Sequence, residues 1–242
     1  DPEYFYDLLN MMISAKMSRK IGFPISEDLV ERERIIADGT LKNCDFALHY
    51  GISMNIAGGT HHAFSDHGEA FCMLNDQAIG AKYLLNKGLA KKILIVDLDV
   101  HQGNGTAEIF QNDTNVFTFS MHGKSNYPFK KEKSDLDIEL EKGTTDDLYL
   151  SILKQNLPKL LDIVQPDFIF YLSGVDVLKS DKLGTLGLTV HGCKLRDQYV
   201  LDTCKKHKIP VQCSMGGGYS EDIRIIVEAH ANTFRLAQSL YF

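Results

Sequence analysis

Residues 92–105 read KILIVDLDVHQGNG, an apolar run that passes into a glycine-rich loop. The run is aliphatic on both faces until it ends, which is typical of a central strand in a parallel sheet. Asp97, Asp99 and His101 then occupy every second position, so their side chains point to one side of the extended chain. Two carboxylates and an imidazole beside a buried strand are costly unless a cation or hydrogen-bond donors compensate them. The stretch therefore predicts a buried strand that ends in a cluster of polar side chains.

The rest of the chain alternates between apolar runs and helical patterns. Four further short runs are β-branched or aromatic, and they occupy 51–58, 115–122, 167–174 and 209–218. Amphipathic patterns that predict helices lie between most of the runs, at 26–39, 75–88, 144–164, 194–208 and 221–240. This alternation predicts an α/β fold with a parallel sheet flanked by helices on both faces. The polar segment 122–143 is expected to form a functional surface loop.

Length and composition limit the number of domains and the kinds of partner. A chain of 242 residues fits one large α/β domain or two small ones, and no linker divides it, so we expect a single domain over 1–242. The net charge of −6 offers no field that attracts nucleic acid, so no such partner is expected. No apolar run reaches about 18 residues, so no membrane partner is expected either.

The cysteines and the first residues bear on cellular location. Five cysteines form no CxxC pair, which indicates a reducing compartment and buried thiols. We therefore expect a cytoplasmic protein, or a nuclear one if the source is a eukaryote. The opening DPEYFYDLL resembles the interior of a domain, so we expect N-terminal elements to precede it.

The polar residues at the strand ends are candidates for a metal site. Asp99 and His101 offer an oxygen and a nitrogen ligand, a set that suits Zn²⁺ or Fe²⁺. Asp176, just after the run at 167–174, could complete an Asp, His, Asp set. Ligands gather beyond the carboxyl ends of strands in open parallel sheets, which favours this grouping. Two alternatives stay open: the first residues could cap a loop through backbone amides, and Asp176 could form an Asx turn.

Two further motifs could carry chemistry. His61 and His62 follow the first apolar run; adjacent side chains diverge, so the pair suits general acid and base work better than shared metal ligation. Alternatively the pair faces solvent and is inert. In SMGGGYS, residues 214–220, the glycines permit close backbone approach and the Tyr219 hydroxyl could stabilise an oxyanion. A tight turn or a phosphate loop is the alternative, but no lysine follows the glycines. The other histidines show no partner and are expected to be surface or satisfied core residues: His49, His67, His122, His191, His207 and His230.

Taken together and in this order, the motifs resemble the histone deacetylase family. The matching stretches are GGTHHAFSDHGEAFCMLND (58–76), VDLDVHQGNG (96–105), LSGVDVLKSDKLGTLGL (172–188) and SMGGGY (214–219). They extend over most of residues 50–220. Asn104 and the segment 138–150 are most like the class IV branch and its bacterial relatives. The resemblance implies an arginase/deacetylase-like α/β fold.

The resemblance also implies roles for the polar residues. It makes Asp99, His101 and Asp176 the ligands of a catalytic metal, normally Zn²⁺, with Fe²⁺ as an alternative. It makes Asp97 the carboxylate that orients His61, and it pairs Asn104 with His62. Many relatives have aspartate in place of Asn104, so the amide should leave His62 less basic. Tyr219 corresponds to the hydroxyl that polarises the acyl carbonyl.

The substrate channel and a second ion follow from the same resemblance. Phe71 corresponds to one wall of the channel that holds the lysine stem, and Tyr127 to the opposite wall. Ala70 stands where many relatives have glycine, which is expected to narrow the channel floor. A structural K⁺ is implied beside the catalytic metal, at Asp97, Asp99, His101, Ser120 and Met121.

The function that these assignments predict is the removal of an acetyl or longer acyl group from lysine side chains. His62 takes a proton from the attacking water and returns it to the leaving amine, while His61 acts electrostatically. The partner is an acylated lysine in a protein or peptide, or a small acylated amine. Three alternatives stay open: a hydrolase of acetylpolyamines or other small amides, a two-metal ureohydrolase, and a catalytically silent acyl-lysine-binding protein. The ureohydrolase would need more carboxylates at the strand ends, and the complete set of catalytic residues argues against a silent protein.

Overall fold

The computed structural model describes all residues from 1 to 242 and contains one parallel sheet. Its six strands are hydrogen-bonded in the order β1-β6-β5-β2-β3-β4. Their bounds are β1 Ile52–Asn55, β2 Ile93–Asp97, β3 Val116–Gly123, β4 Leu136–Leu140, β5 Phe168–Leu172 and β6 Val211–Ser214. On β2, Ile93 lies opposite Val116 of β3 and Phe168 of β5. The stretch that begins at residue 92 is therefore an interior strand, as predicted.

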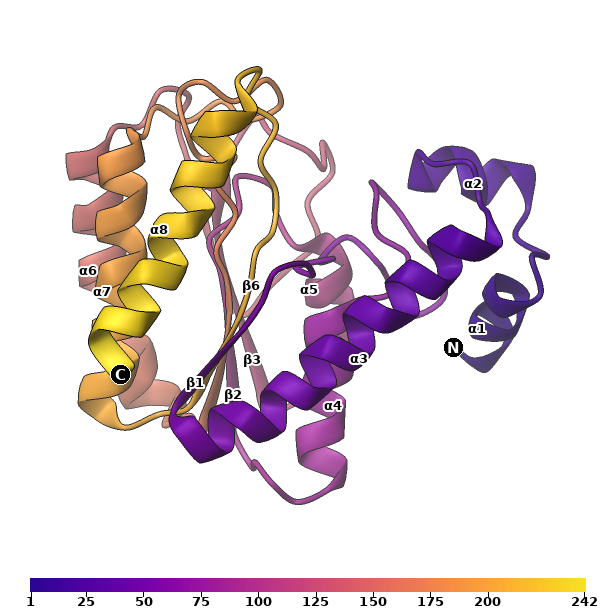
Figure 1. Ribbon diagram of the computed structural model, residues 1–242, viewed down its shortest axis with the longest axis horizontal. Helices are drawn as coiled ribbons and strands as arrows, with labels where there is room; N and C mark the ends of the chain where they lie inside the picture. Colours follow the sequence, from indigo (N-terminus) through magenta and orange to yellow (C-terminus); the bar gives the residue numbers. More distant parts are fainter.

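Helices cover both faces of the sheet (Figure 1). On one face lie α6, α7 and α8, and on the other α3, α4 and α5; α1 and α2 lie beside the N-terminal half of α3. The bounds are α1 Pro2–Leu9, α2 Ala15–Ile21, α3 Glu27–Tyr50, α4 Asp76–Asn86, α5 Asn104–Phe110, α6 Asp146–Val164, α7 Val190–His207 and α8 Ile223–Tyr241. None of these helices is long and apolar enough to cross a membrane. The predicted α/β architecture is thus confirmed.

The apolar core of the sheet has two parts, one on each face, and a smaller third cluster joins α1, α2 and α3. Leu94 and Val96 of β2 pack toward α6 to α8, whereas Ile93 and Ile95 pack toward α3 to α5. Strand side chains alternate between faces, so a strand covered on both sides must be apolar at every position. All five cysteines are buried and unpaired, in agreement with the expected buried thiols.

Two expectations about the elements were wrong. The helix expected over 26–39 continues to Tyr50, because its buried stripe extends through Thr40, Cys44 and Ala47. At Gly39 an added Cβ would lie 3.2 Å from the Asn55 side chain, so this glycine permits close packing and does not end the helix. The segment 122–143 is not wholly irregular, since it contains β4. That strand alternates apolar and acidic residues at the sheet edge, and main-chain pairing with β3 stabilises it.

Three helices were not predicted from the sequence: α1, α2 and α5. The glycines of HQGNG suggested a loop, but Asn104 is already the first residue of α5. Side-chain caps are present at Ser26 of α3 and Asn75 of α4, and each accepts a hydrogen bond from a first-turn amide. Thr145 holds the N-cap position of α6 without such a bond, and α6 runs through Pro158.

Candidate metal centre and active site

Three potential metal ligands meet beyond the carboxyl ends of β2 and β5. Asp99 and His101 follow β2, and Asp176 follows its neighbour β5. His101 Nδ1 lies 3.1 Å from Asp99 Oδ1 and 3.1 Å from Asp176 Oδ2. One ligand atom of each residue lies within 4.8 Å of the other two, and all three residues are buried. Neighbouring parallel strands end at one edge of the sheet, which is why residues 75 positions apart converge here.

The electrostatics of these three residues fit a divalent cation. Burial and the nearby charge of Asp99 raise the pKa of Asp176 to about 7, so two ionised carboxylates are unfavourable together without positive charge. Two oxygen ligands and one nitrogen ligand suit Zn²⁺ or Fe²⁺. The alternative of loop capping is present as well, since Val100 N donates to Asp176 Oδ1 over 2.9 Å and His101 N to Asp99 Oδ1 over 2.9 Å. A carboxylate has lone pairs for both roles.

The glycine-rich segment 214–220 closes one side of this centre. Gly217 N donates to Asp99 Oδ2 over 2.8 Å. A Cβ at Gly217 would overlap the Asp176 carboxylate, and a Cβ at Gly174 would overlap that of Asp99. The predicted close backbone approach is therefore present, and it serves the two carboxylates.

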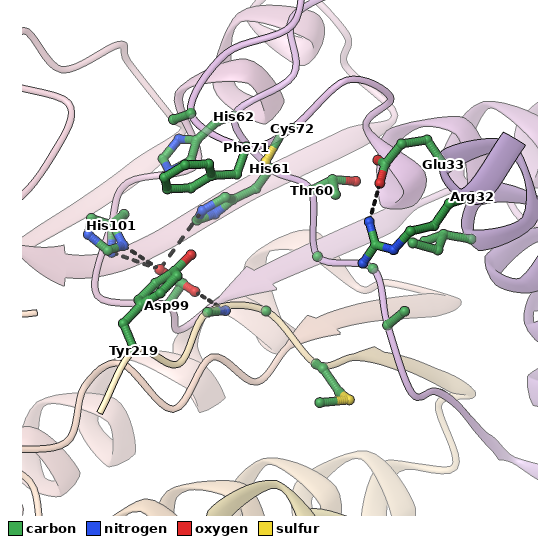
Figure 2. A pocket seen from close by; sticks show the side chains of 18 of the residues that line it. Arg32, Glu33, Thr60, His61, His62, Phe71, Cys72, Asp99, His101 and Tyr219 are labelled. Carbon is green, nitrogen blue, oxygen red and sulfur yellow. Dashed lines mark hydrogen bonds and ion pairs between the residues drawn. The ribbon is translucent and has the colours of Figure 1, made fainter. Parts of the chain in front are cut away.

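His61 and His62 lie beside the centre, and Figure 2 shows both rings in the pocket that holds Asp99 and His101. His61 Nδ1 donates to Asp97 Oδ2 over 2.7 Å, and His62 Nδ1 lies 2.6 Å from Asn104 Oδ1. Their ring centroids are 4.1 Å apart, with the ring planes inclined by 50°. The histidine pair is thus buried and individually partnered, and the inert, solvent-facing alternative is excluded.

The two imidazoles differ in charge. Burial would lower the pKa of His61, but the carboxylates of Asp97 and Asp99 outweigh it and raise that pKa to about 9. Burial and then the charge of His61 hold the pKa of His62 well below its usual value, and the bond to Asn104 offsets this only in part. In the metal-free site at neutral pH, His61 therefore carries a proton and its neighbour His62 does not.

Tyr219 lies across the pocket from the histidines, with its ring centroid 6.3 Å from that of His101 (Figure 2). Burial, with the negative charge of Asp99 and Asp176, raises the pKa of the Tyr219 hydroxyl above its ordinary value. The hydroxyl therefore stays protonated at neutral pH and is available as a hydrogen-bond donor.

Two cavities meet at this centre. An inner cavity of about 480 Å³ extends to Arg32 and Glu33 on α3, as Figure 2 shows. An outer cavity of about 460 Å³ extends to Tyr127, Phe129 and Leu183. Both are lined by His62, Ala70, Phe71, His101 and Tyr219. The expected channel residues Ala70, Phe71 and Tyr127 thus all line the outer cavity.

The loop that carries Ala70 and Phe71 is strained. Both residues have positive φ, 44° and 68°, a region that favours glycine. Their amides are held by α2, since Ala70 N donates to Lys20 O over 3.0 Å and Phe71 N to Ile21 O over 2.7 Å. The methyl group of Ala70 lines the cavity, as expected, but its larger consequence is this backbone strain.

The residues expected around K⁺ are also brought together. Asp97 of β2 lies opposite Ser120 of β3 in register, and Met121 is the next residue of β3. The backbone carbonyl oxygens of Asp99 and His101 accept no hydrogen bond from the protein. Unpaired buried carbonyls are the ligands that K⁺ prefers, so this arrangement fits a monovalent cation.

Several polar residues at or near the site were not found from the sequence. Arg196 of α7 is fully buried, and its guanidinium donates to Leu98 O over 3.1 Å and Gly174 O over 2.7 Å, at the ends of β2 and β5. Its neighbour Asp197 forms an ion pair with it, which in sequence looks like an ordinary exposed helical pair. Glu69 was likewise not predicted from the sequence to be a site residue.

The expectation for the remaining histidines was partly wrong. His122 and His230 are buried, and each has a buried ring nitrogen without a hydrogen-bond partner. Burial lowers the pKa of both rings to about 4, so they are neutral. Leaving a buried ring nitrogen without a hydrogen-bond partner costs less folding free energy in a neutral imidazole than in a charged one. The neutral state of these two rings therefore limits the cost of their unpaired nitrogens.

Comparison with known proteins gives consistent results. A family model described as the histone deacetylase domain matches residues 2–234. An uncharacterized protein of Picosynechococcus sp. is 46% identical over 241 residues, covering 100% of this chain and 80% of that protein. Histone deacetylase 2 of Arabidopsis thaliana is 31% identical, covering 88% of this chain and 56% of the relative. Histone deacetylase HDAC1 of Drosophila melanogaster is 33% identical, covering 70% and 33%. The chain thus spans about half or less of these named deacetylases.

The fold agrees with that of a solved relative. The crystal structure of the HDA15 HD domain superposes with a TM-score of 0.76 at 24% identity, covering 90% of this chain and 67% of that one. This match supports the expected arginase/deacetylase-like arrangement of the sheet and helices. Because the family model extends over nearly all of the sequence, the chain belongs to the histone deacetylase family.

Proposed function

We propose that the protein hydrolyses the acyl amide of acylated lysine side chains, with Zn²⁺ held by Asp99, His101 and Asp176. The observation that carries this proposal is the buried Asp, His, Asp set beside two buried imidazoles, one bonded to the Asp97 carboxylate and the other to the Asn104 amide. A Zn²⁺ ion in this position supplies a Lewis acid for the amide carbonyl and lowers the pKa of a water molecule. The remaining chemistry falls to the side chains around it.

The neutral ring of His62 is suited to move the proton. With Nδ1 bonded to Asn104, its Nε2 can accept a proton from the attacking water and later donate it to the leaving amine. A low pKa keeps this ring unprotonated at the start of the reaction. His62 is therefore assigned as general base and then general acid.

His61 and Tyr219 are suited to stabilise charge. His61, held by the Asp97 carboxylate, is suited to carry a positive charge beside the reaction centre. The Tyr219 hydroxyl donates a hydrogen bond to the carbonyl oxygen as negative charge develops on it. Neither residue exchanges a proton in this scheme.

The two cavities suggest how a substrate lies. The lysine stem would pass between Phe71 and Tyr127 in the outer cavity, and the acyl group would enter the inner one. Ile36, Ile56 and Met215 give the inner cavity apolar walls that would suit an acyl group longer than acetyl. The likeness to the class IV branch predicts the same preference and stays a prediction. Acetylpolyamines and other small acylated amines are the second candidate, because the mouth of the outer cavity would admit them equally.

Two further assignments belong to the proposal. A K⁺ ion would be held by Asp97 and Ser120 with the carbonyl oxygens of Asp99, His101 and Met121. Fe²⁺ could replace Zn²⁺ with the same ligands. The five unpaired cysteines favour a reducing compartment, which is the cytoplasm, or the nucleus in a eukaryote.

The test combines metal content with turnover. Metal analysis and activity are measured on a lysine series carrying acetyl to myristoyl groups and on an acetylated polyamine, for wild type and Tyr219→Phe. We expect one Zn²⁺ per chain and a loss of kcat of about 10²–10³-fold in Tyr219→Phe. Tyr6→Phe, at an exposed tyrosine, is the matched control and should keep full activity. Stoichiometric metal without turnover on any acyl-lysine would refute the lysine hydrolase.

A further inference from the structure

One buried carboxylate near the site has no role in the scheme above. Glu69 lies on the loop between His62 and Phe71, and it is 6% exposed. It lies behind Asn104, on the side away from His62. Buried carboxylates are rare unless they are paired, so its contacts need an explanation.

Three donors hold Glu69 in place. Asn104 Nδ2 donates to Glu69 Oε1 over 3.0 Å, and the Tyr127 hydroxyl donates to the same oxygen. Lys20 of α2 forms an ion pair with Oε2. Burial would raise the pKa of Glu69, but these three bonds outweigh it and hold that pKa below its usual value. Glu69 is therefore an anion that can only accept hydrogen bonds.

This restriction decides which way the Asn104 amide faces. An amide has a donating NH₂ end and an accepting oxygen end, and its partners distinguish them. Because the ionised carboxylate of Glu69 cannot donate, the NH₂ end must face it. The oxygen end must then face His62, where Asn104 Oδ1 lies 2.6 Å from Nδ1.

The orientation of Asn104 in turn decides the tautomer of His62. An amide oxygen can only accept, so the His62 Nδ1 atom must carry the hydrogen. The other ring nitrogen, Nε2, is then left with a free lone pair. That is the atom which must accept the proton of the attacking water.

We propose that Glu69 is a positioning residue that, through Asn104, keeps His62 in the tautomer with hydrogen on Nδ1. This assignment rests on the proposed function for its catalytic consequence, but the tautomer itself can be observed without a substrate. Tyr127 links the same carboxylate to the channel wall, and its ring packs edge-on against His62 at 5.1 Å. The Glu69 carboxylate thus contacts both Tyr127, a residue of the channel wall, and Asn104, which sets the tautomer of His62.

Glu69→Gln tests the assignment because Lys20 makes its outcome specific. Of the three partners only Lys20 cannot accept a hydrogen bond. The oxygen of the new amide therefore faces Lys20, and its NH₂ end faces Asn104 and the Tyr127 hydroxyl, which can both accept. Asn104 then flips and presents its own NH₂ end to His62 Nδ1, which forces the hydrogen onto Nε2. We expect kcat to fall by at least about tenfold, since a histidine in the wrong tautomer cannot act as base. KM should stay within about twofold.

The double variant Glu69→Gln with Asn104→Asp exchanges the amide and the carboxylate. The carboxylate introduced by Asn104→Asp would accept from His62 Nδ1 and from the NH₂ end of the amide introduced by Glu69→Gln. The oxygen of that amide would still face Lys20. The double variant should therefore restore the hydrogen on Nδ1. Because the new carboxylate also raises the pKa of His62, kcat should recover mainly at higher pH. Lys20→Met is the matched control: it breaks the link to α2 but leaves an acceptor facing Asn104, so the tautomer should not change.

The measurement is the pair of ring ¹⁵N chemical shifts of His62 in ¹⁵N-histidine-labelled, zinc-loaded protein, together with kcat and KM on an acetyl-lysine peptide. Zinc content and thermal unfolding check each variant. Wild-type shifts in Glu69→Gln, or a loss of kcat with unchanged shifts and no recovery in the double variant, would overturn the assignment. If Glu69→Gln does not fold, the shifts of the double variant decide. If wild type turns over no acyl-lysine while the shifts follow the predicted pattern, the hydrolase proposal fails and the role of Glu69 stands.

Discussion

His61 and His62 are adjacent in sequence, equally buried and 4.1 Å apart, yet their pKa values move in opposite directions. The difference comes from the partner of each Nδ1 atom. His61 donates to a carboxylate, Asp97, and lies near a second one, Asp99. His62 is bonded to a neutral amide, Asn104, and the nearest carboxylate beyond it, Glu69, is already paired with Lys20.

The adjacent residues His61 and His62 are thus suited to two different functions. Desolvation acts on both rings alike, so only the contacted charge separates them. A fixed cation and a neutral base side by side are what proton transfer with charge stabilisation requires. Carboxylates contribute to the raised pKa of His61, whereas the charge of His61 itself lowers that of His62.

The largest expected effect tests whether His62 transfers the proton while His61 only stabilises charge. We expect His62→Ala to reduce kcat/KM on the order of 10³-fold and His61→Ala to reduce it by roughly tenfold less, because only His62 moves a proton. Steady-state kinetics on an acyl-lysine peptide provide the measurement, with zinc content as the control. Equal losses in the two variants would show that both rings share the proton transfer.

An intermediate effect concerns stability against pH in the zinc-free protein. The pKa of His61 is raised from 6.5 to about 9 in the fold, so its stabilising contribution is complete below pH 6.5 and is lost as pH rises toward 9. His101, with its pKa raised to about 10, and Asp176, with its pKa raised to about 7, act in the same direction, because each keeps in the fold a proton that it has lost in the unfolded chain. The free energy of unfolding should therefore fall between pH 7 and pH 9.

The two histidines should separate again in this experiment. His61→Gln should flatten the decline in unfolding free energy, because the group that retains a proton only in the folded state is gone. His62→Gln should leave the decline unchanged, since His62 is neutral throughout this range. Urea unfolding at pH 7, 8 and 9 provides the measurement; equal slopes in the two variants would contradict the assigned charges.

The smallest effect concerns the strained loop on the His62 side. Ala70 has a φ of 44°, so Ala70→Gly should raise the free energy of unfolding by about 1 kcal/mol. For a chain of this size that corresponds to a Tm increase of about 2–4 °C. Gln165→Gly, at a φ of 48° beyond α6, is a matched control far from the site and should gain as much. A decrease for Ala70→Gly alone would mean that its methyl contacts outweigh the backbone strain.

Local pattern was sufficient for much of the fold and of the candidate site. Two-sided apolar character identified β2 as interior, because a strand covered by helices on both faces has no solvent-facing positions. The spacing of Asp97, Asp99 and His101 predicted their common direction, because strand side chains alternate. The caps at Ser26 and Asn75 were likewise recognisable, since capping depends on neighbouring residues.

Features that depend on contacts between distant segments could be determined only from the tertiary structure. The edge strand β4 gains its stability from pairing with β3, and its own alternation of acidic and apolar residues is a weak signal. Arg196 reaches the ends of β2 and β5 because α7 packs across them, which no helical period reveals. Glu69 meets Asn104 and Lys20 through loop closure, and the charge of each imidazole follows from such contacts. Residue types and spacing thus determine which chemistry is available, whereas strand register and loop closure determine which groups touch and therefore which one carries the proton.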